Sequence, residues 1–450
     1  MTRKVSYLLS AGLLAAVAAP ASAQEQEALL QELAKMRGEM AQMAERMENL
    51  ESQLAETKTQ TETNAAEVKA VAEAEPSNDA SIGFKGAPEI KSEGGWSFKP
   101  RGRLQYDAGI VDAPDSTGRD DGFGNDVRRA RLGVAGDIPG GFGYKFEVDV
   151  ANSDLTVTDA IISYETGNVD VQVGQFNNFQ GLEELTSSLH TSFIERAAFT
   201  DAFNFIRRVG VGVTYGEGDV LVQGGVFTDN MDRLSNQNWS ANGRVVYMPK
   251  IGDAQLHFGG SAHYRSYEDG NTVRYRQRPL VGFTSERFIN TGNMDAESES
   301  GFGLEGAVIA GSFHAAIEGR WQNLDMPMVA DTANFFGGYA EVGYFLTKGD
   351  TRGYKGGKFD RTKPANPVGE GGMGSLQLNV RYDRLDLNDG TVIGGTQDGY
   401  FASLVWKPTD YTMLLANYGR LEYGDAVFPT VTGNRDYGVD VFAVRAQIDF

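Results

Sequence analysis

Hydrophobic and polar residues alternate along most of the chain after residue 95. In the segment 169–175, Val169, Val171 and Val173 occupy one set of alternate positions, and polar residues or glycine occupy the other. Successive side chains of a β-strand point to opposite faces, so this pattern predicts a strand with one apolar and one polar face. The segment 208–215 alternates in the same way and predicts the next strand.

Between these two strands lies a long connection, residues 176–207, which is rich in Phe, Leu, Ile and Ala. Connections this long and this apolar rarely extend into solvent; they fold over or into the protein and carry function. If the strands form a membrane barrel, we expect the connection to fold into the lumen and narrow the pore.

The alternating pattern predicts sixteen strands, most of them near ten residues long. A tilted strand of about ten residues crosses the ~25 Å apolar band of an outer membrane. A soluble β-sandwich or β-helix is the alternative, but sandwich strands are shorter and would not end on an aromatic strand. The predicted strands are 96–110, 126–136, 142–150, 157–165, 169–175, 208–215, 220–228, 242–248, 255–265, 302–310, 313–322, 336–346, 376–384, 400–406, 412–421 and 437–450.

The connections predict the orientation of this barrel. Short turns follow most even-numbered strands, and the longer connections follow most odd-numbered ones. Outer-membrane barrels have short periplasmic turns and long external loops, so both ends of the barrel domain, 95–450, are expected in the periplasm. The segment 348–374 is an exception, because it is too long for a simple periplasmic turn.

The N-terminus predicts export. Arg3 and Lys4 precede an apolar run over 5–19, and Ala21-Ser22-Ala23 supplies a small-residue cleavage pattern. These features indicate a signal peptide over 1–23. An anchoring membrane helix is the alternative, but the run is short and ends at Pro20. No later window approaches the ~18 apolar residues of a transmembrane helix.

A helical segment is predicted over 24–75, followed by a linker over 76–94. Apolar residues recur at alternating spacings of four and three, which is the heptad pattern of a coiled coil. A helix that packs on its own domain is the alternative, but the polar stretch after it offers no partner. The heptad positions are Leu29, Leu33, Met36, Met40, Met43, Met47, Leu50 and Leu54.

Composition and charge narrow the function. The formal net charge of −20 argues against nucleic acid as a partner, because phosphates would be repelled. Pore selectivity depends on the few charges at the constriction, so the net charge does not predict it. The chain has no cysteine, which excludes thiolate metal sites and thiol nucleophiles.

The alternating pattern also predicts which side chains face the lumen. Arginine suits oxyanions because its guanidinium stays charged and presents a planar fork of donors. The same logic places Arg128 on the lipid side. The alternative is that these cations pair with inward Glu and Asp, as barrel interiors are polar anyway. The external connection after the ninth strand adds Arg274 and Arg276, which with Arg278 would present three cations on one side if the segment is extended. The candidates from the strands are Arg101, Arg103, Arg129, Arg131, Lys145, Arg208, Arg244, Arg265, Arg320, Arg381 and Arg445.

An enzyme is not indicated. The four histidines include His257 and His263, which share a strand face some 20 Å apart by strand rise, too far for a shared metal. No phosphate-cradling glycine loop precedes a helix, and no cofactor is expected. Within the long connection, Glu195 and Arg196 are a candidate ion pair, and Phe193 and Phe199 are expected to anchor the connection to the wall.

Residues 83–450 resemble the phosphate-selective porins O and P of Gram-negative outer membranes. The resemblance covers most of the chain and rests on several short motifs. These are Arg128-Arg129-Ala130-Arg131-Leu132-Gly133, Lys145-Phe146-Glu147, Val173-Gly174-Gln175-Phe176, Leu185-Thr186-Ser187, Phe193-Ile194-Glu195-Arg196, Arg207-Arg208-Val209-Gly210-Val211, Gly343-Tyr344-Phe345-Leu346-Thr347-Lys348-Gly349, Arg381-Tyr382-Asp383-Arg384-Leu385-Asp386-Leu387 and the terminal Phe450.

The resemblance implies a homotrimer of sixteen-stranded all-β barrels, each with an inward external loop and an arginine ladder for phosphate or polyphosphate. We therefore expect an outer-membrane porin for small anions whose N-terminal coiled coil lies in the periplasm. Two alternatives remain open. The excess of acidic over basic residues would suit a general or cation-preferring pore, and the coiled coil could tether the barrel to peptidoglycan.

Overall fold

The structure is a computed structural model that describes residues 23–73, 80–119, 122–232, 237–327 and 332–450. The chain divides into two compact units, Met1–Ser77 and Asn78–Phe450. The predicted signal peptide lies almost entirely outside the described residues. Among the described helices, none is long and apolar enough to cross a bilayer.

The first unit contains one long helix, α1 (Ala23–Glu73). The helix agrees with the segment predicted from the heptad pattern, whereas its assembly into a coiled coil stays a prediction. The side chains of Leu29 and Leu33 lie outside those described. The remaining heptad side chains are exposed by 50–71% in the single chain: Met36, Met40, Met43, Met47, Leu50 and Leu54.

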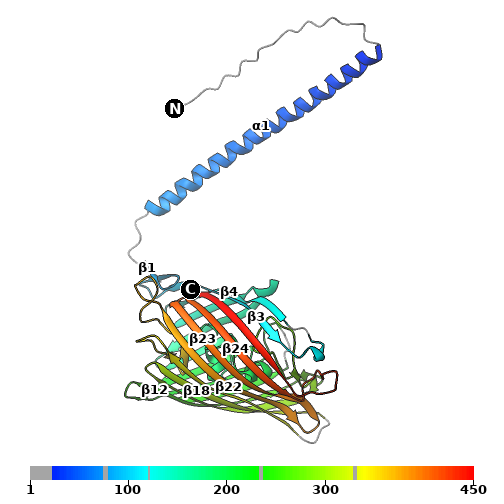
Figure 1. Cartoon of the computed structure of the whole chain (residues 1–450). Helices are drawn as coiled ribbons and strands as arrows, with labels where there is room; N and C mark the ends of the chain where they lie inside the picture. The colour runs from blue at the N-terminus through cyan, green and yellow to red at the C-terminus, as the bar shows by residue number, and fades with distance from the viewer. Residues whose placement is uncertain (1–22, 74–79, 120–121, 233–236, 328–331) are drawn as a thin grey trace. The chain divides into compact units, whose positions relative to one another are not determined.

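The second unit is a closed antiparallel barrel of sixteen strands, in agreement with the sequence prediction (Figure 1). Each strand pairs with its neighbour in the chain, and the last pairs with the first through Val444↔Ala108 and adjacent residues. The strands are β3 (Ser97–Asp112), β4 (Gly122–Ile138), β5 (Phe142–Asp149), β6 (Thr156–Thr166), β7 (Val169–Asn177), β8 (Arg207–Glu217), β9 (Val220–Phe227), β10 (Trp239–Tyr247), β12 (Ala254–Ser266), β17 (Ser298–Ala310), β18 (Phe313–Asp325), β19 (Ala333–Phe345), β22 (Ser375–Asp389), β23 (Val392–Thr409), β24 (Thr412–Gly424) and β25 (Tyr437–Asp449).

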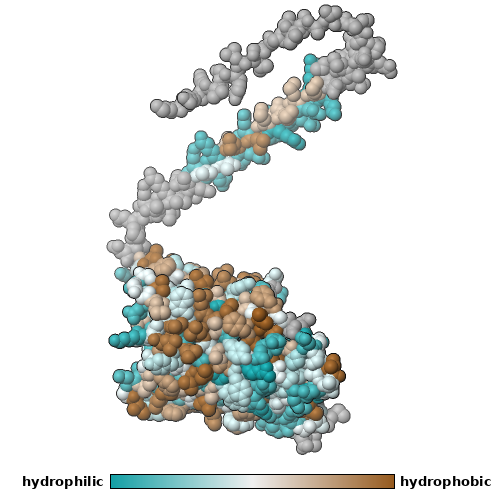
Figure 2. All heavy atoms as spheres, in the orientation of Figure 1, coloured by the Kyte–Doolittle hydropathy of each residue, from teal (hydrophilic) through white to brown (hydrophobic). Residues whose placement is uncertain are grey.

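Alternation along each strand produces an apolar outer face. Leu104 is 45% exposed and Ile317 is 60% exposed, whereas the neighbouring Gln105 is fully buried inside. Figure 2 shows the resulting hydrophobic surface over much of the barrel. An apolar outside with a polar inside is the arrangement expected of a transmembrane barrel.

A short hairpin precedes the barrel, where the sequence predicted a linker over 76–94. Strands β1 (Ala80–Phe84) and β2 (Pro88–Ser92) pair with each other, and β2 continues onto β3 through Ile90↔Phe98. The linker prediction is therefore wrong for these residues. The turn at Gly86, with φ of 78°, was the available signal, because a positive φ favours glycine.

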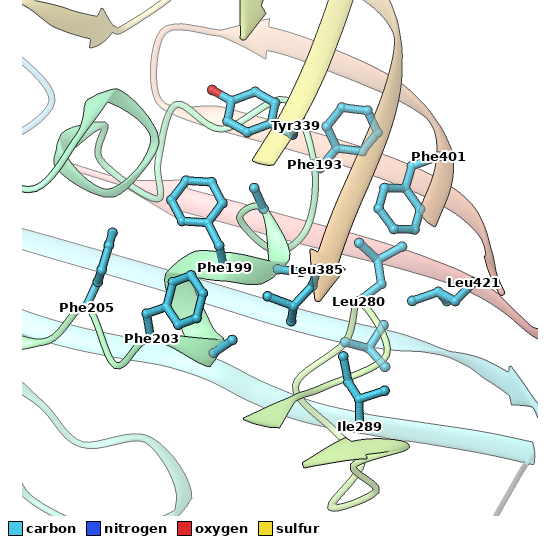
Figure 3. Close-up of a cluster of buried hydrophobic side chains, with 14 of the residues drawn as sticks. Phe193, Phe199, Phe203, Phe205, Leu280, Ile289, Tyr339, Leu385, Phe401 and Leu421 are labelled. Carbon is cyan, nitrogen blue, oxygen red and sulfur yellow. The ribbon is translucent and has the colours of Figure 1, made fainter. Parts of the chain in front are cut away.

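The connection from β7 to β8, residues 178–206, lies inside the barrel. It contains two short helices, α2 (Leu182–Leu185) and α3 (Ala198–Ala202). Most of its apolar side chains are buried among inward side chains of the wall: the ring centroids of Phe193 and Phe401 are 6.3 Å apart, and Phe199 stacks on Tyr339 with ring centroids 6.4 Å apart (Figure 3). These residues belong to a hydrophobic cluster within the barrel.

The connection from β12 to β17, residues 267–297, joins the same cluster. It forms two small two-stranded sheets, and Tyr275, Val281 and Phe288 in it are fully buried. Tyr275 packs edge-on against Phe203 of the first connection. The two connections therefore pack together as one apolar plug; its short strands are β13 (Thr272–Val273), β14 (Arg276–Gln277), β15 (Ile289–Asn290) and β16 (Met294–Asp295).

The connection from β19 to β22, residues 346–374, enters the barrel from the opposite end. It forms a hairpin of β20 (Gly353–Lys355) and β21 (Lys358–Asp360). The Tyr354 hydroxyl lies 2.6 Å from His257 Nδ1, and Gly357 O accepts a hydrogen bond from Arg244 at 2.7 Å. This inward hairpin accounts for the length that a simple turn could not explain.

Candidate permeation pathway

The plug is attached to one side of the barrel wall. The Glu318 carboxylate on β18 accepts the backbone N–H groups of Leu182 and Glu183, at 2.9 and 2.7 Å. The Asp383 carboxylate on β22 accepts the N–H of Ala198 at 2.8 Å. Both helices of the plug therefore begin at a carboxylate of the wall, which satisfies amide groups that no intrahelical acceptor could reach.

Buried arginines reinforce the attachment. Arg381 lies 2.9 Å from Glu183 of the plug and 2.6 Å from Glu341 of β19. Arg445 bonds Asp107 at 2.6 Å and lies 3.5 Å from Glu195 of the plug. These charges are compensated in place, so their role is to hold the plug against β18–β25.

An open cavity remains on the other side of the plug, along β3–β10. Its volume is about 380 Å³, and nine cationic side chains line it against one carboxylate, Asp159. The register explains the concentration of charge, since Arg103↔Arg131 and Gln105↔Arg129 are inward pairs on adjacent strands. The cations are Arg101, Arg103, Arg129, Arg131, Lys145, Arg196, Arg207, Arg244 and Lys358.

Several of these cations have carboxylate partners. Lys145 and Arg207 share Asp159 at 2.6 and 2.8 Å, and Arg131 lies 2.8 Å from Asp149. Because one carboxylate often serves two cations, the cavity keeps an excess of positive charge.

Three lining cations are not paired in this way. Among the described residues, Arg101 and Lys358 have no carboxylate within 4.0 Å, and Arg129 donates only to the Gln105 side-chain oxygen, at 2.9 Å. Unpaired donors aimed into a water-accessible cavity are available to an anion.

Two further cavities adjoin the first, and their linings mix cations with carboxylates: Glu184, Glu195 and Asp201 in one, and Glu147, Asp410 and Asp449 in the other. A cavity of about 180 Å³ shares Arg129 and Arg196 with the first and adds Arg128 and Arg278. A cavity of about 450 Å³ at the end that carries the C-terminus shares Arg101 and Arg103. Its other cations are Lys85, Lys99, Arg361 and Lys363.

The structure separates the thirteen predicted candidates into three groups. Arg274 and Arg276 are exposed on the connection 267–297. The second group, which does not line the cavity, is bonded within the wall or beneath the plug: Arg208, Arg265, Arg320, Arg381 and Arg445. The third group lines the cavity: Arg101, Arg103, Arg129, Arg131, Lys145 and Arg244.

Arg128 was placed on the lipid side by alternation, and that prediction is wrong. A register shift opposite Gln105 and Tyr106 inserts one extra residue into β4, so Arg128 and Arg129 both reach the lumen. Arg128 donates to both carboxylate oxygens of Glu195, at 2.6 and 3.1 Å. The predicted Glu195–Arg196 pair is also wrong, because Arg196 lies 3.4 Å from Glu184.

Sequence reasoning also missed three lining residues, Arg196, Arg207 and Lys358. Arg207 was assigned to the connection, and Arg196 to an ion pair inside it. Lys358 lies at the inward hairpin beside Gly356 and Gly357, whose φ values of 57° and 71° allow the tight turn. The Gly-Gly pair was the signal for a hairpin, but not for its position inside the barrel.

At the loop end, Arg287 lies close to other arginines. Burial and the repulsion of Arg278, Arg276 and Arg274 lower the pKa of Arg287 to about 10, with Asp201 opposing this change.

The inward histidines sit beside glutamates. His257 lies 3.7 Å from Glu305, and His314 lies 3.6 Å from Glu341. Within the described part of the chain, no group of three or more metal-ligating side chains occurs.

A closed sixteen-stranded barrel with an apolar exterior and a charged, partly plugged interior defines an outer-membrane channel. A model of the family described as phosphate-selective porin O and P matches residues 98–450. The chain belongs to this family.

The chain is also similar to known proteins. An uncharacterized protein of Caulobacter vibrioides is 43% identical over 454 residues, covering 95% of this chain and 91% of that protein. Among solved structures, OmpT of Vibrio cholerae lacking loop L8 matches with a TM-score of 0.52 and 13% identity, covering 79% of this chain and 100% of that one. The anion-selective porin from Comamonas acidovorans matches with a TM-score of 0.51, 13% identity and the same coverage. At these identities the solved structures establish the fold.

Proposed function

We propose that the protein is a porin through which small anions diffuse passively, with phosphate or polyphosphate as the preferred solute. The observation that carries the proposal is the cavity with nine cations and one carboxylate. A solute passing such a constriction exchanges part of its hydration for protein donors, and guanidinium forks match phosphate oxygens.

The net charge of −20 does not contradict this proposal. Charges outside the lumen are screened within about 8 Å at physiological ionic strength, whereas lining charges act on the solute directly. Family membership supports phosphate as the anion, and the anion selectivity stated for the Comamonas porin supports the class.

The test is the zero-current potential of the purified protein in a planar bilayer across a KCl gradient, followed by titration with phosphate. We expect an anion-selective potential and a chloride conductance that phosphate blocks. A cation-selective potential would contradict the proposal and favour the general or cation-preferring pore.

We further propose that three copies assemble, with α1 as a periplasmic three-stranded coiled coil. Six exposed heptad side chains support this, since an apolar seam without a partner costs free energy in water. Replacing Met40 and Met47 with Lys should shift the oligomer toward monomer in native mass spectrometry, while Lys35→Gln on the polar face should not. An unchanged oligomer would exclude this role of the seam.

The coiled coil could also tether the barrel to peptidoglycan. Deleting residues 24–75 separates the two roles: a pure porin keeps its conductance and leaves the envelope intact, whereas a tether loses peptidoglycan co-sedimentation.

A further inference from the structure

Two apolar side chains line the cation-rich cavity, one from the barrel wall and one from the plug. Ile161 occupies an inward position of β6, opposite Lys145 on β5, and Leu185 ends helix α2 of the plug. Both line the cavity and both are only partly buried, so they present hydrocarbon to its water. Neighbouring inward positions of the same wall carry polar residues such as Gln172 and Thr214.

The apolar surface is supported from behind. Phe176 and Phe179 also line the cavity, with ring centroids 6.2 Å apart, and Phe227 packs edge-on against both at 5.3 and 6.1 Å. Ile161 packs on this phenylalanine cluster. The lining of the cavity therefore contains, among its cations, an apolar strip made of Ile161, Phe176 and Phe179 on the wall and Leu185 on the plug.

This strip contributes nothing to the binding of inorganic phosphate, which is polar on every side. An organic solute with an apolar body would instead remove water from Ile161 and Leu185 on binding, and this burial is favourable. The cations Arg101, Arg129 and Lys358, which lack carboxylate partners among the described residues, favour a solute with more than one negative charge. A phosphate monoester carries about −1.5 to −2 at pH 7. The cavity volume, about 380 Å³, is within the range of sites for small organic ligands.

We propose that the cavity binds organic phosphate monoesters with a compact apolar body more tightly than inorganic phosphate. The phosphate group contacts the cations of β3 and β4 and the hairpin tip, and the body lies along Ile161 and Leu185. This inference rests on the proposed anion porin and, within the phosphate class proposed above, makes monoesters rather than inorganic phosphate the preferred solute.

The experiment compares three blockers of chloride conductance in planar bilayers of the full-length protein: inorganic phosphate, phenyl phosphate and benzoate. We expect phenyl phosphate to block at about tenfold lower concentration than inorganic phosphate, as the burial of a few apolar groups would give. Benzoate, which has the ring and a single charge, should block weakly.

Variants test whether Ile161 and Leu185 cause the difference between the two blocking concentrations. Ile161→Thr with Leu185→Gln should bring the blocking concentrations of phenyl phosphate and phosphate together and leave the phosphate value unchanged. Ile309→Thr is the matched control, because this isoleucine is buried in the plug cluster and does not line the cavity. Gln172→Leu adds apolar surface to the lining and should widen the difference.

Equal block by phosphate and phenyl phosphate in the unaltered protein would overturn the inference without any variant having to fold. An anion-selective potential in the same bilayers would then leave the porin proposal standing. If benzoate and phenyl phosphate block equally well, the phosphate group is not required for binding and the proposed solute class is wrong. A cation-selective potential would overturn both proposals.

Discussion

The two sides of the barrel interior contain the same kinds of residue and differ in how those residues are paired. Along β18–β25, Arg381 and Arg445 are 4% and 1% exposed and each contacts two carboxylates. Along β3–β10, Arg101 and Arg129 line a cavity, and in the described part of the chain neither has a carboxylate within 4.0 Å. Arg381 and Arg445 are thus structural groups, whereas Arg101 and Arg129 are available donors.

The difference arises from the plug. It brings Glu183 and its backbone amides to β18 and β22, and it places Glu195 between Arg445 of β25 and Arg128 of β4. The opposite wall receives mainly Arg196 and the small side chains Ser187 and Ser188. Positive charge is therefore neutralised where the plug binds and left in excess where it does not.

The largest effect is expected for a buried ion pair on the β18–β25 side of the barrel, where the plug is attached. Arg381→Met leaves Glu183 and Glu341 buried without their cation, and removing one partner of a buried ion pair costs about 3–5 kcal/mol. We expect a clearly lower thermal unfolding midpoint by circular dichroism. Arg101→Met on the cavity side is the control and should leave the midpoint unchanged; equal midpoints for both variants would contradict the distinction.

The second prediction concerns two arginines of the cavity lining, whose charge is reversed. Arg129→Glu with Arg131→Glu changes the formal charge at the lining by four and should abolish the proposed anion preference in the zero-current potential. Arg320→Gln is the control, because Arg320 is 1% exposed beneath the plug and bonds Gln180 and Ser261. Unchanged selectivity of the double variant would show that these arginines do not face the permeating ion.

A third prediction concerns the inward hairpin. Replacing residues 351–360 with a short glycine turn removes Gly356 and Lys358 from the cavity lining. We expect a larger single-channel conductance, because the cavity widens, and a weaker anion preference. Lys358→Gln alone should weaken the preference and leave the conductance nearly unchanged. If neither variant alters the channel, the hairpin does not border the ion path.

The smallest effect tests the bulge in β4. Arg128→Gln removes two hydrogen bonds to the Glu195 carboxylate, but both side chains are partly exposed and Arg445 remains 3.5 Å from Glu195, so the expected cost is about 1 kcal/mol. We expect a modest loss of thermal stability. Arg119→Gln, whose pair with Glu286 is 3.8 Å long and partly exposed, should have almost no effect. A stability loss no larger for Arg128→Gln would place this arginine outside the plug contact.

Much of the site could be predicted because alternation is a local property. Arg101, Arg103, Arg129, Arg131, Lys145 and Arg244 were nominated from strand periodicity, and all six line the cavity. The prediction for Arg128 was wrong because β4 contains a bulge. One inserted residue reverses which side chains point inward beyond it, and the alternating pattern does not show where such a residue lies.

The sequence alone determined the barrel, its sixteen strands and the long helix, because these depend on spacings of two and of three to four residues. Only the tertiary structure decided which wall the plug covers, that residues 346–374 enter the lumen, and which arginines remain unpaired. The physical reason is that pairing between charges depends on contacts between segments far apart in the chain, such as Arg381 with Glu183. No local pattern records those contacts.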